Sequence, residues 1–498
     1  MATMMTSEPL IARNPATEAE LGRVPTTPPG RVAEEMARAR RAQARWANRS
    51  WRERRAALKR WWGLLSREAD ALADVIRAAV GKPRAEASSE MVMALDGIRW
   101  TGNHGHRALG EKAIGAGWQR FLMIPSARLR YRPVGVVGMI GTWNYPVFLN
   151  APAIAQALAA GNAIVWKPSE LASMVGLRLQ QTLDAAGLPE GLVAAVFGGP
   201  EVGRALVEAG PDKGMFTGGI DNGRRVLEAL ASRGIPALAE LSGFDPAIVL
   251  PDAPRDATLR ALTWGAFVGS GQTCVAVKRV YVVGDPGPWA EGLSEYARRL
   301  RVGDPGAAEV DLGPMISAGA RDRFDAMVRT AVEAGARVLA GGKPAAGPGW
   351  FYPPTVLLAD TPEPESRLAG AFGPVVLIRG FPDPDAAVAA ANSGIYALAA
   401  SVWGRDLRAA RDIAWRTEAG TVSINEAVTP TGHASAPFGG MKASGFGRTH
   451  GVLGLREFTQ PQVVFTRRPR SFRPQLFPYS PRLERALTWY RRLFHPPA

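Results

Sequence analysis

The chain contains a single cysteine, and the residues before it favour chemistry at its thiol. Cys274 ends the segment Gly269-Ser270-Gly271-Gln272-Thr273-Cys274, a flexible turn that is expected to open a new element. A thiol at a helix N-terminus or in a nest of backbone amides has its thiolate favoured, which lowers its pKa below about 8.5. The same amides can hold a developing oxyanion. Cys274 is therefore a candidate nucleophile, although a lone cysteine is more often a small buried apolar residue.

A glycine turn is a second candidate site. Gly218 and Gly223 form a Gly-x-x-x-x-Gly spacing between a predicted strand and a predicted helix. The backbone at such a turn can bind a pyrophosphate, because the helix N-terminus favours negative charge. The spacing differs from the usual Gly-x-Gly-x-x-Gly fingerprint of dinucleotide-binding proteins, so by itself it is a weak indication.

The elements that must position these residues alternate along the chain. Two or three helices are predicted over residues 31–79, and a strand, a bend and a second strand over 129–140. The strands that follow are predicted at 163–167, 192–197, 214–217 and 236–241, and the helices at 150–160, 171–186, 202–208 and 222–233. Short apolar strands that alternate with helices predict a parallel, doubly wound sheet covered on both faces.

A second alternating set is predicted after residue 244. Its strands are expected at 247–250, 279–283 and 420–425, and its helices at 259–268, 321–334 and 383–392. Cys274 then lies between the first helix of this set and the strand that follows it. The sequence therefore predicts an α/β protein with two such sheets.

The bulk composition fits a cytoplasmic α/β protein. The 498 residues are 46% hydrophobic, which is enough for several domains. We find no run of 18 apolar residues and no signal-peptide pattern at the N-terminus, so we expect no membrane span and no secretion. One cysteine excludes an intramolecular disulfide, and the five histidines include no HExxH pair, so we expect no structural metal.

Positive charge is concentrated at the C-terminus. The net charge is +15, and residues 467–498 contain eight arginines and a single acidic residue, Glu484. No helix-turn-helix, zinc-finger or RNA-binding signature accompanies this charge, so we expect no nucleic-acid partner. Residues 480–494 fit a helix with an apolar face. This helix either docks on its own or a partner subunit, or forms an amphipathic contact with an anionic membrane.

Seven motifs, taken in order, resemble those of the NAD(P)-dependent aldehyde dehydrogenase superfamily over roughly residues 10–467. They are Gly141-Thr142-Trp143-Asn144-Tyr145-Pro146, Trp166-Lys167-Pro168-Ser169-Glu170, Phe216-Thr217-Gly218-Gly219, Glu240-Leu241-Ser242-Gly243, Gly271-Gln272-Thr273-Cys274, Phe372-Gly373-Pro374, and Pro437-Phe438-Gly439-Gly440-Met441-Lys442-Ala443-Ser444-Gly445-Phe446-Gly447-Arg448. One such motif would be weak evidence, whereas seven in order are strong.

The resemblance implies an aldehyde dehydrogenase-like fold in four parts. The expected parts are an NAD-binding domain at 1–114 and 134–243, a bridging or oligomerisation segment at 115–133 and 455–467, a catalytic domain at 244–454, and a basic amphipathic tail at 468–498. A homodimer or homotetramer is expected, with a strand near 463–466 pairing across the dimer.

The resemblance also implies the chemistry. Cys274 would add to an aldehyde carbon, with the Asn144 amide and the Cys274 backbone N–H holding the resulting oxyanion. Glu240 would activate the water that hydrolyses the thioester, a role that needs a pKa raised by burial. A glutamate here favours hydrolysis over acyl transfer to coenzyme A. A semialdehyde-specific or coenzyme A-acylating enzyme remains an alternative, as does a catalytically impaired protein that binds nucleotide or membrane.

The cofactor site implied by the resemblance uses residues from the first predicted sheet. The expected residues are Trp143, Lys167, Ser169, Glu170, Gly218, Gly219, Gly223 and Phe372. Lys167 and Glu170 match the positions that hold the adenosine ribose. A carboxylate there repels a 2′-phosphate, so NAD is expected, with NADP possible.

Two places depart from the pattern of the family. Ser242 and Phe244 stand where a glycine and a lysine are usual. Gly370 stands where a glutamate usually holds the nicotinamide ribose. We therefore predict a loosely held nicotinamide and slow hydride transfer, because small misplacements of reacting groups are costly.

Aromatic residues bear on the substrate that we expect. They are Trp143, Tyr145, Phe148, Trp264 and Phe267. Such residues suggest an apolar tunnel for a long-chain or aromatic aldehyde, although aromatic residues at these places are more often core.

Overall fold

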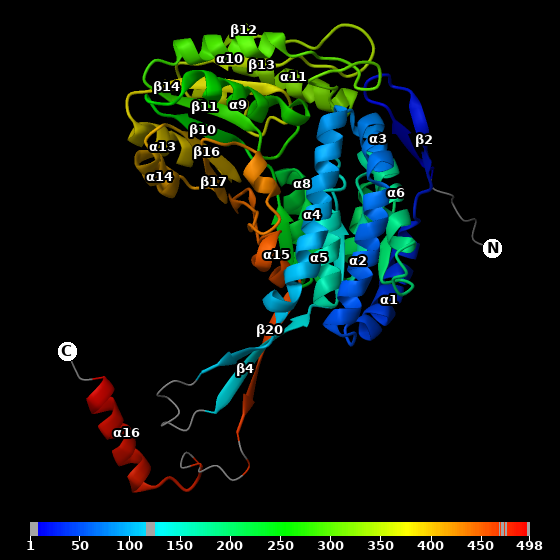
Figure 1. The fold of residues 1–498 in the computed structure, drawn as a ribbon, viewed down its shortest axis with the longest axis vertical. Helices are drawn as coiled ribbons and strands as arrows, with labels where there is room; N and C mark the ends of the chain where they lie inside the picture. The colour runs from blue at the N-terminus through cyan, green and yellow to red at the C-terminus, as the bar shows by residue number, and fades with distance from the viewer. Residues whose placement is uncertain (1–7, 116–124, 468, 470–472, 474–475, 496–498) are drawn as a thin grey trace. The chain divides into compact units, whose positions relative to one another are not determined.

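The computed structural model describes residues 8–115, 125–467, 469, 473 and 476–495 (Figure 1). Contacts divide the chain into two units. The larger unit contains Met1–Ala108 and Pro133–Thr459, and the smaller contains Leu109–Arg132 and Gln460–Ala498. The larger unit has two main sheets with helices around them, so the expected α/β class with parallel sheets is confirmed.

The first main sheet has six strands, in the order β19-β9-β8-β5-β6-β7. Their bounds are β5 Val136–Ile140, β6 Ala163–Lys167, β7 Val193–Ala195, β8 Lys213–Thr217, β9 Ala237–Glu240 and β19 Gly445–Phe446. All neighbours are parallel except β19, which runs antiparallel to β9. The strands predicted at 163–167, 192–197, 214–217 and 236–241 are all present.

Helices and a short hairpin surround this sheet. The helices are α1 Pro29–Trp46, α2 Trp51–Arg67, α3 Ala69–Val80, α4 Arg84–Leu109, α5 Ala151–Ala160, α6 Ser173–Asp184, α7 Pro200–Glu208 and α8 Ile220–Ala231, with the 3-10 turn η2 Glu170–Ala172. The hairpin is β1 Leu10–Arg13 with β2 Glu20–Val24. Every residue of α5 is buried, which matches its run of apolar side chains. Figure 1 shows α2, α4 and α5 side by side.

The second main sheet has seven strands, in the order β12-β13-β14-β11-β10-β16-β17. They are β10 Asp245–Val249, β11 Val277–Val283, β12 Arg337–Ala340, β13 Thr355–Leu358, β14 Val375–Phe381, β16 Ala399–Trp403 and β17 Thr421–Ile424. Only β12 is antiparallel to its neighbour. Residue 244, where we predicted the catalytic domain to begin, lies between β9 of the first sheet and β10 of the second.

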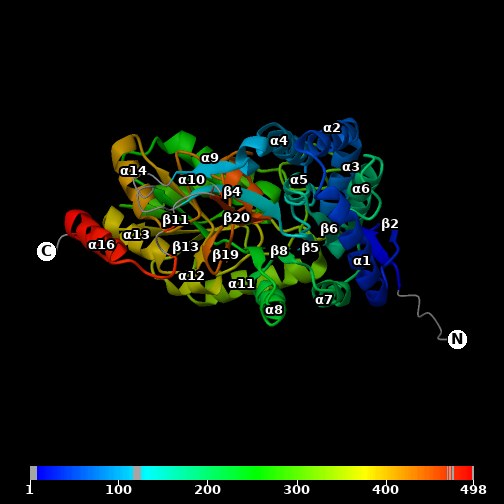
Figure 2. The same cartoon turned by 90° about the horizontal axis from the view of Figure 1, so that it is seen from below.

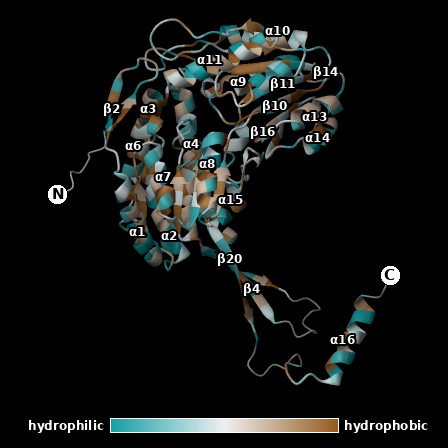
Figure 3. Ribbon diagram, turned by 180° about the vertical axis from the view of Figure 1, so that it is seen from behind, coloured by the Kyte–Doolittle hydropathy of each residue, from teal (hydrophilic) through white to brown (hydrophobic). Residues whose placement is uncertain are grey.

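Further helices and short elements complete the larger unit. They are α9 Arg255–Phe267, η3 Val268–Gly271, α10 Gly287–Arg299, α11 Ala318–Glu333, α12 Glu363–Arg367, α13 Pro384–Asn392, β15 Tyr396–Ala397, α14 Leu407–Arg416, η4 Thr429–Gly432, β18 Met441–Lys442 and α15 Gly451–Glu457. Hydrophobic clusters lie on both faces of the seven-stranded sheet, one against α9 and α10 and another against α13 and α14. The hydrophobic colouring of the central strands in Figure 3 agrees with this arrangement.

The smaller unit has a three-stranded sheet, in the order β20-β4-β3, and one helix. The elements are β3 Lys112–Ile114, β4 Ser126–Pro133, β20 Thr459–Thr466 and α16 Pro481–Phe494, all labelled in Figure 1 except β3. Residues 463–466 lie in β20, an edge strand that pairs with β4 of the same chain. Its pairing with a second copy stays a prediction, as do the boundaries of the four predicted parts. Residues 116–124 of the predicted bridging segment lie outside the described residues.

Helix α4 is the long element that was not predicted. It has 26 residues, and its first turns carry Glu86 and Glu90. Figure 2, a view from below, labels it beside α2. The helix matters for function because it brings these carboxylates beside the segments that contain Asn144 and Cys274.

Neither a membrane span nor a metal cluster is found in the described part of the chain. None of its helices is long and apolar enough to cross a membrane. Within the same residues, no three His, Cys, Asp or Glu side chains gather as metal ligands would.

Candidate active site

A cleft of about 690 Å³ in the larger unit brings together the three predicted catalytic residues, Cys274, Glu240 and Asn144. Asn144 follows β5, and Glu240 is the last residue of β9. In parallel sheets, ligands bind beyond the carboxyl ends of the strands, and both residues lie at such ends. Cys274 enters from the loop between η3 and β11.

The loop before Cys274 has an unusual backbone. Gly269, Ser270 and Gly271 all have positive φ, at 63°, 55° and 67°. For serine this conformation is unfavourable by about 1–2 kcal/mol, so surrounding contacts must hold it. The Ser270 hydroxyl donates to the Gly313 carbonyl at 2.8 Å, and the Lys278 ammonium donates to the Gly271 carbonyl at 2.7 Å. A side chain at Gly271 would collide with the Gly373 carbonyl, only 2.2 Å from its Cβ position.

The expectation of a lowered thiol pKa is wrong for this structure. Burial raises the pKa of Cys274 to about 12, and the nearby carboxyls of Asp245 and Glu240 act in the same direction. The backbone amides of Val275 and Cys274 lower it, as predicted, but by less. Nor does the residue begin a helix, since the next element is β11. The resting protein therefore keeps this thiol protonated.

The Asn144 side chain is oriented by two hydrogen bonds. Its Oδ1 accepts from the Thr142 hydroxyl at 2.8 Å, and its Nδ2 donates to the Gln272 carbonyl at 3.0 Å. A primary amide has two N–H donors, so one donor remains after the bond to Gln272. Asn144 can therefore hold an oxyanion while fixed to the loop that carries Cys274.

Glu240 is a buried carboxyl with little polar support. It is only 6% exposed, and among the described residues no donor lies within ordinary hydrogen-bond geometry of its oxygens. Burial raises its pKa well above the ordinary value, and the charge of Arg448 and the nearby Thr449 hydroxyl only partly oppose this effect. Buried polar groups are rarely left unpaired, and such a group is a strong indication of function.

The glycines of the last motif give Glu240 its space. A Cβ at Gly439 would lie 3.0 Å from Glu240 Oε1. Gly445, at φ 122°, pairs with Glu240 across the β19–β9 ladder, where a Cβ would meet the Ala239 carbonyl. The Pro437–Arg448 segment therefore forms a wall directly against the carboxylate, which explains why small residues stand there.

Four of the eight predicted cofactor residues line the cleft: Trp143, Phe372, Gly218 and Gly219. The rings of Trp143 and Phe372 meet edge to face, with centroids 5.6 Å apart. Gly219 is the N-cap of α8, and a Cβ there would meet nothing within 4 Å. A helix N-terminus with open space and exposed amides fits the phosphates of a dinucleotide.

The other four predicted cofactor residues lie outside the lining of the cleft. Gly223 is inside α8, where a Cβ would lie 2.5 Å from Leu241, so its small size lets the helix pack closely on the sheet. Lys167 and Glu170 form an ion pair at 2.8 Å, and Ser169 caps the turn η2. The neighbouring Leu171 does line the cleft. A ribose role for these residues stays a prediction.

The structure shows what surrounds the residues at the two places that depart from the family pattern. Gly370 lies in the cleft at φ 83°, and a Cβ there would lie 2.5 Å from the Tyr396 hydroxyl. Phe244 is buried beneath the guanidinium of Arg279, 5.0 Å from its ring centre. Ser242 lines the cleft, and its carbonyl accepts from the Ser444 hydroxyl at 2.8 Å.

The nearest glutamate to Gly370 in sequence is Glu365, and it belongs to another site. It is buried with Arg279 and Arg379, at 3.1 and 2.9 Å, and it accepts from the Tyr281 hydroxyl. Glu365 therefore does not supply the carboxylate that Gly370 lacks.

Sequence reasoning missed Asp245, although it acts directly on the thiol. Asp245 is buried, and burial raises its pKa well above the usual range. A Cβ at Gly243 would lie 2.3 Å from the Cys274 carbonyl and 2.7 Å from Asp245 Oδ1. A charged residue directly after an apolar Phe, at the first position of a buried strand, was the available signal. Of the five aromatic residues expected to form an apolar tunnel, Trp143 lines this cleft, whereas Tyr145, Phe148, Trp264 and Phe267 do not, and Trp264 is 47% exposed.

Comparison with known proteins gives consistent matches. The model of the aldehyde dehydrogenase family matches residues 3–464. The 4,4'-diapolycopene aldehyde oxidase of a Methylomonas species is 35% identical, over 92% of this chain and 86% of its own. A Mycolicibacterium smegmatis protein named "Putative succinate-semialdehyde dehydrogenase, NADP(+)" is 36% identical, over 96% of this chain and 93% of its own.

Solved structures agree with the sequence matches. An aldehyde dehydrogenase of Mycobacterium tuberculosis, complexed with NAD+, is 29% identical with a TM-score of 0.89, covering 94% of this chain and 96% of its own. Lactaldehyde dehydrogenase of Escherichia coli is 30% identical with a TM-score of 0.89, covering 93% of this chain and 97% of its own.

Proposed function

Because the chain belongs to the aldehyde dehydrogenase family, an oxidoreductase family, we propose that it oxidises an apolar aldehyde to the carboxylic acid with NAD(P). The observation that carries this proposal is the buried carboxyl of Glu240, with little polar support, in the same cleft as Cys274 and Asn144. A nucleophile, an oxyanion donor and a base in one cleft are the parts that acyl chemistry requires.

The proposed reaction begins at the thiol. The sulfur of Cys274 bonds to the aldehyde carbon, and the thiol proton passes to the Glu240 carboxylate, which then releases it to solvent. The oxygen becomes an oxyanion held by the Asn144 amide and the Cys274 backbone N–H, and the loss of one such donor costs about 10²–10³ in rate. NAD(P), when bound, would accept the hydride that leaves this carbon, and Trp143, Phe372, Gly218 and Gly219 would hold it in the cleft. A thioester on Cys274 then remains.

Glu240 completes the proposed cycle. It takes a proton from a water molecule, the water oxygen bonds to the thioester carbon, and the carbon–sulfur bond breaks to give the acid and the free thiol. A base must have a pKa near the working pH, and burial raises that of Glu240 in this direction. The presence of Glu240 supports hydrolysis over transfer to coenzyme A.

The decisive test is a steady-state assay of NAD(P)H formation with a panel of aldehydes, using Cys274→Ser as control. We expect turnover in the wild type and none in the variant. Equal acid release with and without coenzyme A would support hydrolysis. The absence of turnover on every aldehyde would refute the proposal in favour of a protein that only binds nucleotide.

An apolar substrate is supported by the lining of the cleft, which includes Leu149, Ile316, Phe324, Met327, Ile395, Leu398 and Phe438. The similarity to a relative named 4,4'-diapolycopene aldehyde oxidase also supports an apolar substrate. A semialdehyde is the second candidate, because Arg224 and Arg323 also line the cleft and could bind a carboxylate. Comparing kcat/KM for decanal, benzaldehyde and succinate semialdehyde separates the two candidates.

We propose NAD as the preferred cofactor, with NADP also used. The support is the carboxylate of Glu170, which the adjacent Lys167 holds at 2.8 Å. A carboxylate at the ribose accepts hydroxyl hydrogen bonds and repels a 2′-phosphate. A relative whose name includes NADP(+) supports the use of NADP instead. KM values for the two cofactors, measured in the wild type and in Glu170→Gln, test the role of the carboxylate.

We propose a cytoplasmic dimer or tetramer whose basic tail contacts anionic membrane. In α16, Leu487, Trp489 and Leu493 are all more than half exposed, while Arg482, Arg485, Arg491 and Arg492 are also exposed. This combination suits the surface of an anionic bilayer. Flotation with phosphatidylglycerol vesicles should carry the full chain but not a chain cut near residue 467. Equal flotation would exclude the contact, and sedimentation equilibrium would give the number of subunits.

A further inference from the structure

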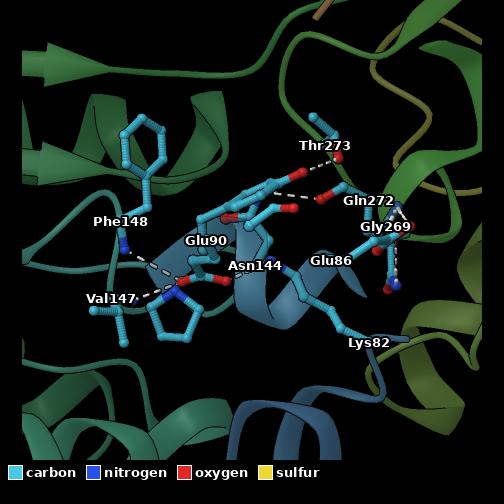
Figure 4. Close-up of polar contacts among 12 residues, drawn as sticks. Lys82, Glu86, Glu90, Asn144, Val147, Phe148, Gly269, Gln272 and Thr273 are labelled. Atoms are coloured by element: carbon cyan, nitrogen blue, oxygen red, sulfur yellow. Dashed lines mark hydrogen bonds and ion pairs between the residues drawn. The ribbon is translucent and has the colours of Figure 1, made fainter. Parts of the chain in front are cut away.

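Three charged residues spaced four apart connect α4 to the candidate active site. They are Lys82, just before α4, and Glu86 and Glu90 within it. Figure 4 shows Glu90 toward Val147 and Phe148 and Glu86 toward Gly269. The Lys82 ammonium lies 2.6 Å from Glu90 Oε2, and both side chains are almost fully buried, at 4% and 0% exposed. The mechanism proposed above uses none of the three.

Glu90 holds the turn that follows Asn144. Its Oε1 accepts from the backbone N–H of Val147 at 2.8 Å and from that of Phe148 at 3.2 Å. With Lys82 on the other oxygen, both carboxylate oxygens are used. Glu90 therefore anchors the segment of the oxyanion donor to α4.

Glu86 holds the loop of the nucleophile. Both of its oxygens accept from the Gly269 backbone N–H, each at 3.1 Å. Gly269 is the first of the three positive-φ residues before Cys274. Backbone amides at such left-handed residues favour an anion, and hydrogen bonds to an ionised group are about twice as strong as neutral ones. The negative charge of Glu86 thus stabilises the left-handed backbone of the loop.

Two further contacts connect the segments to each other. The Lys82 ammonium lies 3.4 Å from the centre of the Tyr145 ring, a cation–π contact. The Tyr145 hydroxyl lies 2.9 Å from the Thr273 hydroxyl oxygen, one residue before Cys274. The oxyanion segment, the nucleophile loop and α4 therefore share one network.

We propose that Glu86 is a positioning residue whose ionised carboxylate holds the Cys274 loop in its reactive conformation, with Lys82 and Glu90 fixing the partner segment. The proposal deepens the function proposed above and rests on it for the effect on turnover. Its effect on the thiol itself can be measured without any aldehyde.

The carboxyl of Glu86 changes its protonation state near neutral pH. Burial raises its pKa to about 7, opposed chiefly by the charge of Lys82, while Glu90 raises it further. Tyr145 is the titratable group that faces it from the other segment, and residues 269–273 carry no charged side chain. Below pH 7 the carboxyl is neutral and its bond to the Gly269 N–H weakens. Above pH 7 the bond is charge-assisted.

Alkylation by iodoacetamide tests the proposal, because Cys274 is the only thiol in the chain. The rate is measured from pH 6 to pH 8 and divided by the thiolate fraction. In the wild type we expect this corrected rate to rise by about threefold to tenfold, the equivalent of one hydrogen bond. In Glu86→Gln it should stay flat, at the low value. Glu86→Asp, which keeps the charge, should restore part of the rise.

Asp96→Asn is the matched control, because it removes an exposed carboxylate from the same helix. It should behave as the wild type. In the turnover assay, Glu86→Gln should lower kcat by about threefold to tenfold and leave KM for NAD(P) unchanged. A flat corrected rate in the wild type, or the same rise in Glu86→Gln, would overturn the proposal. Failure of the proposed function would appear separately, as absent turnover with an unchanged alkylation profile.

Discussion

The Tyr396 hydroxyl occupies the space beside Gly370 into which a side chain would have to extend, 2.5 Å from the position of a Cβ. Both residues line the cleft. The surrounding structure therefore suits a glycine at position 370, because the Tyr396 hydroxyl fills the space that a longer side chain would need.

Gly370→Glu should lower activity although it restores the residue that is usual in the family. The new side chain would meet Tyr396, and φ 83° is strained for any residue but glycine. We expect a lower kcat and a lower melting temperature than in the wild type. The double variant Gly370→Glu, Tyr396→Ala should recover part of the stability. A single variant with a lower KM for NAD(P) and full stability would contradict this account.

A second prediction concerns our expectation that the nicotinamide is loosely held. If no carboxylate holds its ribose, KM for NAD should be higher than is typical of the family. An aldehyde deuterated at the carbonyl carbon should then give a lower kcat, because hydride transfer limits turnover. A KM within the family range together with no isotope effect would show that other residues hold the ring.

Asp245→Asn should make the Cys274 thiol more acidic. After burial, the Asp245 carboxyl is the largest factor that raises the thiol pKa. Asparagine keeps the shape and removes the charge. Burial raises the pKa of Asp245 itself well above its usual range, so its charge acts on the thiol only where the carboxyl is ionised. We expect faster alkylation by iodoacetamide at pH 9, and an unchanged rate there would disprove the electrostatic link.

Glu240→Gln should separate the two halves of the reaction. Without the base, the acyl group stays on Cys274, so a burst of NAD(P)H should be followed by little or no turnover. Since the charge of Glu240 also raises the thiol pKa, alkylation should become faster in the same variant. In the wild type, deacylation should accelerate as pH rises through the raised pKa of Glu240, because only the ionised carboxylate can take the proton of water. Full steady-state turnover in the variant would exclude Glu240 as the base.

His450 should destabilise the folded protein in acid. It is 5% exposed, and burial lowers its pKa from 6.5 to about 4. The unfolded chain therefore binds this proton first, so stability is complete above pH 6.5 and falls as pH decreases toward 4. The loss amounts to about 3 kcal/mol. His450→Phe, which suits the neighbouring rings of Phe148 and Phe438, should remove this part of the acid sensitivity in urea unfolding at pH 5 and 7.5.

The sheets could be predicted from the sequence because their strands are apolar runs bounded by turn residues. The strand predicted at 163–167 matches β6, and that at 236–241 contains β9, whose last residue is Glu240. Helix α4 was missed for a physical reason. Its buried face carries Ala87, Met91, Ala94 and Ile98 at helical spacing, but Glu90, Gly97, Thr101 and Gly105 interrupt the apolar pattern. A Cβ at Gly97 or Gly105 would collide with Pro152 or Trp51.

The site could be predicted only in part. The presence of Cys274, Glu240 and Asn144 in one cleft matches the motifs. The thiol pKa could not be predicted, because the local amides were visible in the sequence whereas burial and the carboxyl of Asp245 depend on the fold. The anchoring of both segments by Glu86 and Glu90 was equally hidden, since these two residues precede Asn144 by more than fifty positions in sequence.

A single, protonated thiol also determines how the protein reacts with oxidants. The thiolate, rather than the thiol, attacks a peroxide, so a Cys274 pKa of about 12 should make the resting protein slow to oxidise. Once oxidised to a sulfenic acid, Cys274 would have no second cysteine in the chain to form a rescuing disulfide. Recovery would depend on a small external thiol, and further oxidation would be irreversible. The same burial that delays the first step thus leaves no internal repair after it.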